Sequence, residues 1–248
     1  MPRTTAGIGL DGCRGGWIAA TAHASGAVEL TLLSRIEALE AMLAAFGPRP
    51  PTTLIDIPIG LPLVGERPID VEARAALGRA ASSVFTVPPR PVFDALDFSE
   101  AQALARGAMG KGFSIQAWNI LPKIREVDLW LRRRGGTPPI REAHPELAFR
   151  GLARLADLGG VEFENKKTAA GQHQRKSILE ALGVDITGVG PLKAGAVTAG
   201  TDDVLDAMAL AALARSPAHE RGTLPQRSTV DPFGFPMEMV VPRILIGK

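Results

Sequence analysis

TTAGIGLDGCRGGWI, residues 4–18, is a small apolar run that leads to one acid, Asp11, then a glycine-rich turn and a second apolar run. Residues 5–11 and 16–23 are each typical of a buried strand, with the turn as a tight link between them. A strand that delivers a carboxylate to its end, beside such a turn, suits a metal ion or a phosphate. One acid holds neither alone, so Asp11 needs partners from elsewhere in the chain.

The elements that follow predict an α/β fold. Residues 27–34 are typical of a third strand, which completes an antiparallel meander. Apolar residues then recur every three or four positions over residues 36–46, which indicates an amphipathic helix. A short apolar run, residues 53–57, is consistent with a buried strand and carries Asp56. A single helix before it predicts a right-handed crossover, which lays this strand parallel to the first and sets Asp56 near Asp11.

The rest of the chain predicts one more strand, several helices and two irregular regions. Residues 138–144 are expected to form the fifth strand. Helical patterns cover residues 70–80, 114–134, 147–156, 172–182 and 201–216. Residues 58–113 are expected to form an elaborated insertion, residues 186–200 a glycine-rich link, and residues 230–248 a hairpin-like extension. Together these elements predict a single domain, residues 1–248, with a mixed five-stranded central sheet flanked by helices.

Composition narrows the class of protein. The chain has 248 residues, of which 46% are hydrophobic, enough for a sizeable core, and 22% are charged, which argues against disorder. A net charge of +2 argues against a large cationic field over the whole chain. A single cysteine, Cys13, excludes an internal disulfide and a cysteine-based zinc site. No apolar run is long enough for a membrane span, and we expect a cytoplasmic protein.

The helix at 201–216 carries three acids, of which pairs three or four residues apart share a face. Asp202 and Asp203 are also suited to cap the helix N-terminus, where carboxylates bind free backbone N–H groups. Capping explains Asp206 poorly, because Asp206 lies more than a turn inside the helix, among apolar residues. A carboxylate buried there needs a partner.

Acids from three separate elements would repel one another at one sheet edge unless a cation neutralised them. Asp11, Asp56 and Asp206, with Asp203 as a further candidate, supply the oxygen ligands that suit Mg²⁺ or Mn²⁺. Such ions stabilise the attacking and leaving oxygens of phosphodiester cleavage. Each acid taken singly is explained at least as well as a solvated strand end.

Further candidates lie beside these acids. Glu142 and His144 share one face of the expected fifth strand, where His144 would orient water or carry a proton, although a lone histidine is more often structural. Arg14, Lys166 and Lys167 flank the acidic elements, and they are the candidates for contact with substrate phosphates. Scattered basic residues of this kind are usually a solvated surface.

Seven stretches in this order resemble the DUF429 family of predicted RNase H-like nucleases: GLDGCRGGW (9–17), LIDIPIGLP (54–62), ARAALGRAASSVF (73–85), GKGFSIQAWNILPKIREVD (110–128), EAHPELAF (142–149), KKTAAGQHQR (166–175) and TDDVLDAMALA (201–211). The resemblance implies the ribonuclease H-like fold, with acids on the first strand, the fourth strand and the last helix. In this chain those positions hold Asp11, Asp56 and either Asp203 or Asp206, with Glu142 as an added candidate. The resemblance brings no established substrate.

Three functions are compatible with these residues. The first is a metal-dependent nuclease that cleaves nucleic acid with bound Mg²⁺ or Mn²⁺. The second is a nucleotide phosphate-binding protein like the actin and sugar-kinase ATPases, which share this fold and place an Asp-Gly-rich turn around a phosphate, but usually need two such domains. The third is a non-catalytic module that binds metal or nucleic acid. The sequence does not distinguish DNA from RNA as the substrate or endonuclease from exonuclease action, and it does not indicate an oligomeric state.

Overall fold

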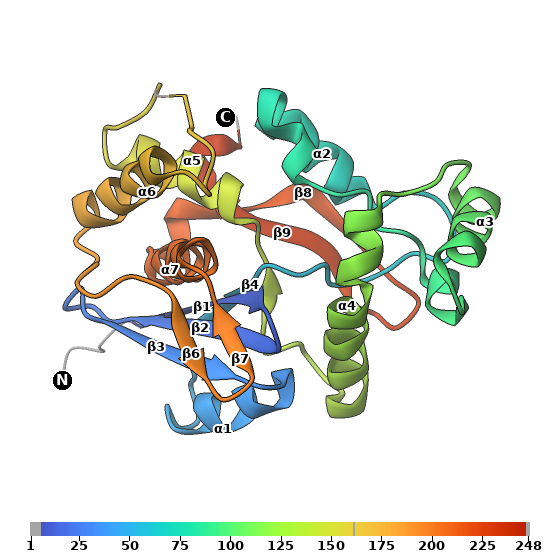
Figure 1. The fold of residues 1–248 in the computed structure, drawn as a ribbon, viewed down its shortest axis with the longest axis horizontal. Helices are drawn as coiled ribbons and strands as arrows, with labels where there is room; N and C mark the ends of the chain where they lie inside the picture. Colours follow the sequence, from blue (N-terminus) through green and yellow to red (C-terminus); the bar gives the residue numbers. More distant parts are fainter. Residues whose placement is uncertain (1–5, 161, 247–248) are drawn as a thin grey trace. The chain divides into compact units, whose positions relative to one another are not determined.

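A computed structural model describes residues 6–160 and 162–246, which form two compact units (Figure 1). The first unit comprises the chain up to Asp56, Pro139–Gly222 and the chain from Val240 onwards. The second unit comprises Ile57–Pro138 and Thr223–Met239. The region expected to be an insertion, residues 58–113, lies in the second unit, and the central sheet lies in the first. No helix in the described part of the chain is long and apolar enough to span a membrane.

The first unit is built on a five-stranded sheet of order β3-β2-β1-β4-β5. Its strands are β1 (Gly7–Cys13), β2 (Gly16–Ala22), β3 (Val28–Leu33), β4 (Thr52–Ile55) and β5 (Arg141–Glu142). The first three are antiparallel, β4 is parallel to β1, and β5 is parallel to β4. The prediction of a mixed five-stranded sheet, with the fourth strand beside the first, is therefore confirmed.

Two of the parallel strands are shorter than the sequence suggested. β4 ends at Ile55, so Asp56 follows the strand instead of lying in it, and β5 has only two residues. Prolines explain the short β5, because Pro139 precedes it, Pro145 follows it closely, and proline has no N–H for a ladder. His144 is consequently outside the strand, at the start of helix α5 (Pro145–Leu155).

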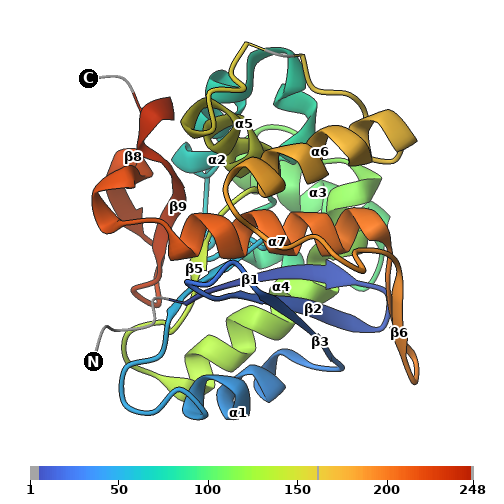
Figure 2. The same cartoon turned by 90° about the vertical axis from the view of Figure 1, so that its left-hand side faces the viewer.

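Helix α7 (Thr201–Arg215) packs on one face of this sheet, and the short helix α1 (Leu39–Ala44) lies on the other (Figure 2). Glycines in β1 allow the close approach of α7. A Cβ atom at Gly9 would fall on the carbonyl oxygen of Ala207, and one at Gly7 would fall on the backbone at Arg215. The helix therefore runs antiparallel along β1, and its first turns lie beside the carboxyl end of that strand.

Helix α6 (Ala169–Ala181) and a small hairpin complete the first unit. The hairpin, β6 (Leu192–Ala194) with β7 (Val197–Ala199), lies in the region that the sequence suggested was only a glycine-rich link. Its strands are too short to show a period of alternation, and contacts with β2 and β3 stabilise them. The helices expected at 147–156 and 172–182 are α5 and α6, with slightly shifted ends.

The second unit is mostly helical. Its helices are α2 (Pro68–Leu77), α3 (Phe98–Met109) and α4 (Ile115–Arg134). Helix α3 was missed, although Asp97 caps its start by accepting from Glu100 N–H at 2.9 Å, because its apolar stripe is weak and its end reads as a turn. Helix α4 agrees with the expected 114–134 and continues through Pro122 without a break.

A β-hairpin contributes to the second unit and carries an ionic anchor. Its strands are β8 (Arg221–Val230) and β9 (Pro236–Pro242), so the hairpin begins before the extension expected at 230–248. In its turn, Asp231 accepts from Arg90 at 2.6 Å, and the same guanidinium makes two 2.9 Å bonds to Asp128 of α4. Paired in this way, the buried charges hold the hairpin turn against α4.

Candidate functional site

Three acids from three elements of the first unit form one group, which we call the acidic cluster: Asp11, Asp56 and Asp206. Asp11 lies on β1, Asp56 directly follows β4, and Asp206 lies in the second turn of α7. The Asp56 N–H donates to the Leu10 carbonyl at 2.9 Å, so the ladder between β1 and β4 extends to Asp56. Asp11 is 7% exposed and Asp206 is 1% exposed, so two of the three are taken out of water.

The acids of the cluster sense one another's charge. Burial raises the pKa of Asp11 well above its usual value, and the charges of Asp56 and Asp206 raise it further. Burial also raises the pKa of Asp206, to about 6, and the charge of Asp56 adds to the rise. For Asp56, burial raises the pKa, while His144 and Lys166 lower it. Neighbouring carboxylates respond in this way when they compete for the same few compensating charges.

Lys166 provides positive charge beside the cluster. Its Nζ atom lies 2.5 Å from Oδ2 of Asp206, an ion pair between a side chain that is 41% exposed and one that is 2% exposed. Burial disfavours the ammonium, but the charges of Asp206, Asp11 and Asp56 outweigh this effect and raise the pKa of Lys166. Lys166 is therefore positively charged at any physiological pH, and it faces all three acids.

An anchored turn holds Lys166 in this place. The guanidinium of Arg175, on α6, donates to the carbonyls of Glu164 and Gly171 at 3.0 and 3.1 Å, and to Glu146 Oε2 at 2.9 Å. Arg175 is 3% exposed, so these bonds are made in a buried setting. They clamp the segment before Lys166 between α5 and α6.

Side-chain caps complete the same turn. Thr168 Oγ1 accepts from the Gly171 N–H at 3.1 Å, which begins α6, and donates to the Asn165 carbonyl at 2.8 Å. From the sequence, Arg175 is one of several scattered basic residues that are candidates for contact with phosphate, and the structure shows instead that it anchors this turn. The signal present in KKTAAGQHQR is Thr168, a residue type that is favoured at a helix N-cap.

The structure separates the roles of the two acids that the sequence left open. Asp203 Oδ2 accepts from the Gly200 N–H at 2.9 Å, so Asp203 caps α7. Burial raises the pKa of Asp203, and the bond from Gly200 lowers it. Asp206 takes no part in this cap, and its side chain is bonded to Lys166. The capping explanation thus holds for Asp203, whose charge also raises the pKa of Asp11, and Asp206 is the acid of α7 that is paired with Lys166.

The glycine-rich turn after Asp11 is a tight hairpin. Gly15 has a φ of +79°, which a side chain would strain, and the Gly12 N–H donates to Asp11 Oδ1 at 2.7 Å. Arg14 bridges to β7: its N–H donates to the Thr198 carbonyl at 3.1 Å, and its carbonyl accepts from the Thr198 N–H at 2.9 Å. Two backbone N–H groups of the turn are therefore already hydrogen-bonded within the protein. The Arg14 residue is exposed.

The remaining candidates lie around the cluster. His144 begins α5 close enough to Asp56 to lower its pKa. Glu142 is 2% exposed and lies beside Ile55 in the register of β4 and β5. Lys167 is exposed, and its charge lowers the pKa of Asp203. The structure thus brings Asp11, Asp56, Asp206, Lys166 and His144 together, and places Arg14 and Lys167 on the surface.

The donor atoms of the acidic cluster suit a hard cation, but the side chains are not arranged around a metal position. Its donors are carboxylate oxygens, which Mg²⁺ and Mn²⁺ prefer. Within residues 6–160 and 162–246, no three His, Cys, Asp or Glu side chains are already arranged around a metal position. The positive charge seen among these acids belongs to Lys166.

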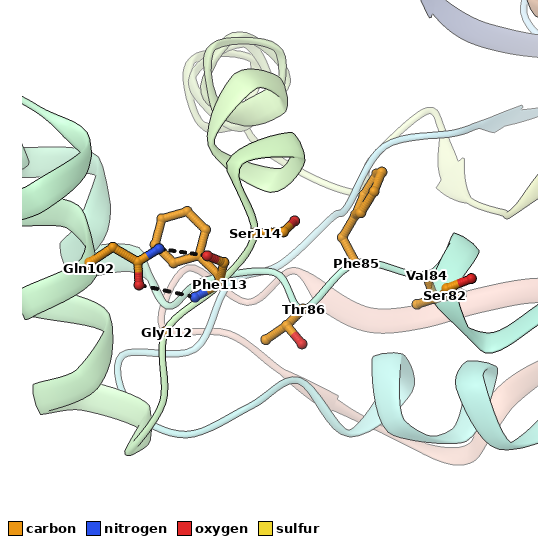
Figure 3. Close-up of a pocket in the computed structure, with 8 residues that line it drawn as sticks. All are labelled: Ser82, Val84, Phe85, Thr86, Gln102, Gly112, Phe113 and Ser114. Atoms are coloured by element: carbon orange, nitrogen blue, oxygen red, sulfur yellow. Dashed lines mark hydrogen bonds between the residues drawn. The ribbon is translucent and has the colours of Figure 1, made fainter.

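A separate hollow of about 360 Å³ lies in the second unit (Figure 3). Its lining residues are Ser82, Val84, Phe85, Thr86, Gln102, Gly112, Phe113 and Ser114. The Gln102 amide closes one wall: Nε2 donates to the Phe113 carbonyl at 2.6 Å, and Oε1 accepts from the Phe113 N–H at 3.4 Å (Figure 3). None of these lining residues is acidic, so the hollow has a different chemistry from the acidic cluster.

Fold and site together define an α/β protein with a mixed sheet, at whose carboxyl edge two buried acids and a partly buried one lie near one lysine. The family described as "Protein of unknown function (DUF429)" matches residues 9–230. This match covers most of the chain, and the protein belongs to the DUF429 family. Neither the curated proteins nor the solved structures contain a match to the chain.

Proposed function

We propose that this protein is a metal-dependent phosphodiester hydrolase with an RNase H-like fold, which acts on nucleic acid. The observation that carries the proposal is the convergence of Asp11, Asp56 and Asp206 from β1, the end of β4 and α7. Buried acids that raise one another's pKa are costly to the fold, and such arrangements concentrate at functional sites. The RNase H-like assignment is supported by the strand order β3-β2-β1-β4-β5 and by a last helix packed on β1.

The acidic cluster would hold Mg²⁺ or Mn²⁺ through Asp11, Asp56 and Asp206, with Asp203 as a fourth candidate. When bound, such an ion supplies a water nucleophile at neutral pH and stabilises the leaving oxygen of the phosphodiester. The ion must bring a charge that compensates three acids of low exposure, which a divalent cation does more fully than a single ammonium. Glu142 remains a candidate for a further carboxylate at this edge.

The chain's other residues would position substrate and move protons. His144, next to Asp56, is placed to accept or donate a proton on the parallel-strand side of the cluster. Lys166 and Lys167 follow one another on the turn before α6, and Arg14 is exposed on the hairpin after Asp11. These cations would hold the phosphate backbone, contacts that fix position and carry no sequence information.

The alternative of an actin-like or sugar-kinase-like phosphate-binding turn receives less support. That function needs backbone N–H groups free to face a phosphate. Here the Gly12 N–H is bonded to Asp11, and the Arg14 N–H is bonded to Thr198. The turn is a hairpin held by internal hydrogen bonds, and the feature that demands a ligand is the group of acids beside it.

The test of this function is a calorimetric titration with Mn²⁺ beside a cleavage assay on single-stranded, duplex and RNA–DNA hybrid substrates. The wild type should bind Mn²⁺ and cleave at least one substrate, whereas Asp11→Asn should bind about tenfold more weakly or worse, because ligand charge sets cation affinity. Glu180→Gln, an exposed acid of α6, is the matched control and should behave as wild type.

Two results would contradict the proposal. If the wild type bound Mn²⁺ but cleaved none of the substrates, the protein would be a binding module. If ATP were hydrolysed in a parallel assay while nucleic acid stayed intact, the nucleotide-binding alternative would replace the nuclease.

A further inference from the structure

We propose that Lys166 is a resident counter-cation that a divalent metal ion must displace from Asp206, so that metal binding and release of the lysine side chain form one coupled step. The inference rests on the proposed function, since it concerns the same acidic cluster. It assigns to Lys166 a part in controlling the site as well as a contact with substrate.

One carboxylate oxygen of Asp206 cannot serve both cations in the arrangement seen. Lys166 Nζ lies 2.5 Å from Oδ2 of Asp206. A bound Mg²⁺ or Mn²⁺ would lie about 2.1 Å from its carboxylate oxygens. An ammonium and a divalent ion that shared this oxygen would be close neighbours with strong mutual repulsion, and little water is present to screen it because the Asp206 side chain is 2% exposed.

The Lys166 side chain can leave the cluster while its backbone stays in place. The turn is held on both sides of Lys166, through the bonds of Arg175 to Glu164 and of Thr168 to Asn165. The side chain itself is 41% exposed and extends on a flexible four-carbon stem. Displacement therefore requires a change of side-chain rotamers and no unfolding of the turn.

Lys166 has a different role in the metal-free site and in the metal-bound site. Without metal, Lys166 compensates the buried carboxylate of Asp206, and removal of this charge would be strongly unfavourable. With metal, the compensation passes to the ion, and the released ammonium remains next to the site on its anchored turn. It is then available for a phosphate oxygen of the substrate, so a single residue stabilises the empty site and binds substrate in the loaded one.

The experiment compares Mn²⁺ binding, by calorimetry, in the wild type, Lys166→Met and Lys193→Met. Lys166→Met should bind Mn²⁺ about tenfold more tightly than wild type, because only the wild type gives up a charge-assisted hydrogen bond when metal enters. Lys193→Met is the matched control, since it removes an equal charge from an exposed position on β6, and its affinity should stay near that of wild type.

Thermal unfolding gives a second readout. In chelator, Lys166→Met should unfold at a lower temperature than wild type, because Asp206 loses its counter-charge. Saturating Mn²⁺ should raise the unfolding temperature of Lys166→Met by more than that of wild type, since tighter binding stabilises more. Lys166→Gln serves as a second neutral variant, and Lys166→Arg, which keeps the positive charge, should bind Mn²⁺ with an affinity closer to wild type.

The possible failures are distinguishable. If the wild type binds Mn²⁺ but the neutral Lys166 variants bind it equally or more weakly, the displacement proposal is wrong and the metal site stands. If Lys166→Arg binds as tightly as Lys166→Met, competition between charges is not the cause. If neither the wild type nor any variant binds Mn²⁺, the proposed function loses its metal site.

Discussion

A carboxylate buried inside an alanine-rich helix constrains this site more than any other side chain. Asp206 is 1% exposed and lies within Val204–Ala214, a segment of α7 that is buried throughout. Nothing in the local sequence compensates its charge, and the compensation comes from Lys166 on a different element. At the scale of one residue, the buried carboxylate lowers the stability of the fold and concentrates negative charge at the cluster.

The ionisation of Asp206 predicts how metal-free stability changes with pH. Its pKa in the folded protein is about 6, against a usual value of 3.8, so the folded state favours the protonated form. The resulting contribution to stability is fully present below about pH 3.8 and is lost as the pH rises to about 6. In urea titrations with chelator, the wild type should lose this part of its unfolding free energy over that range, while Asp206→Asn should not.

The comparison between the two proteins isolates the contribution of the Asp206 charge, which includes its effect on the pKa of Asp11. Parallel pH profiles for the wild type and Asp206→Asn would show that Asp206 ionises with its usual pKa. The charge of Lys166 is constant over this range, so it adds no slope of its own.

At the scale of elements, the contact of β1 with α7 sets the geometry of the cluster. The glycines at 7 and 9 remove the side chains that would hold the helix away from the strand. The same sequence feature therefore shapes the core and brings the first turns of α7, with Asp206, to the strand end that carries Asp11.

Close packing at Gly9 and open space at Gly107 predict opposite effects for two glycine-to-alanine changes. Gly9→Ala places a methyl group on the Ala207 carbonyl, and it should lower the unfolding free energy by about 2 kcal/mol or more, as overpacking does. Gly107→Ala, in helix α3 with open space around its Cβ position, should raise it by about 0.5–1 kcal/mol. Denaturant titrations measure both, and a neutral Gly9→Ala would contradict the close packing.

The elements differ in how well the sequence predicted them. The hydrophobic runs and the one helix between them predicted β1 to β4 in their observed order, since a crossover of this kind has a fixed hand. The hairpin β6–β7 and the helix α3 were missed. Their local patterns are short or weak, and they are stabilised by packing on other elements, which no local window of sequence records.

At the scale of the whole molecule, the near-neutral charge limits how nucleic acid could be bound. With 28 basic and 26 acidic residues, the chain has no large excess of positive charge, so few phosphates should be neutralised on binding. The affinity for an oligonucleotide should accordingly depend only weakly on salt concentration.

The salt dependence also tests one of the phosphate contacts. In the Asp11→Asn background, where cleavage is expected to be lost, the slope of log affinity against log salt should become shallower by about 1 when Lys167 is changed to Met. Fluorescence anisotropy at several salt concentrations measures this slope. An unchanged slope would remove Lys167 from the substrate contacts.

The sequence by itself determined the strand order of the sheet through β4, most of the helices, and the candidate acids Asp11, Asp56 and either Asp203 or Asp206. Apolar periodicity records which face of a segment is buried, and an acid inside such a segment is visible as an exception. Only the tertiary structure showed that Asp203 caps α7, that Asp206 joins the cluster, and that Lys166 compensates it. Lys166 and Asp206 are 40 residues apart, and their contact depends on a turn held by Arg175, an arrangement that no local pattern encodes.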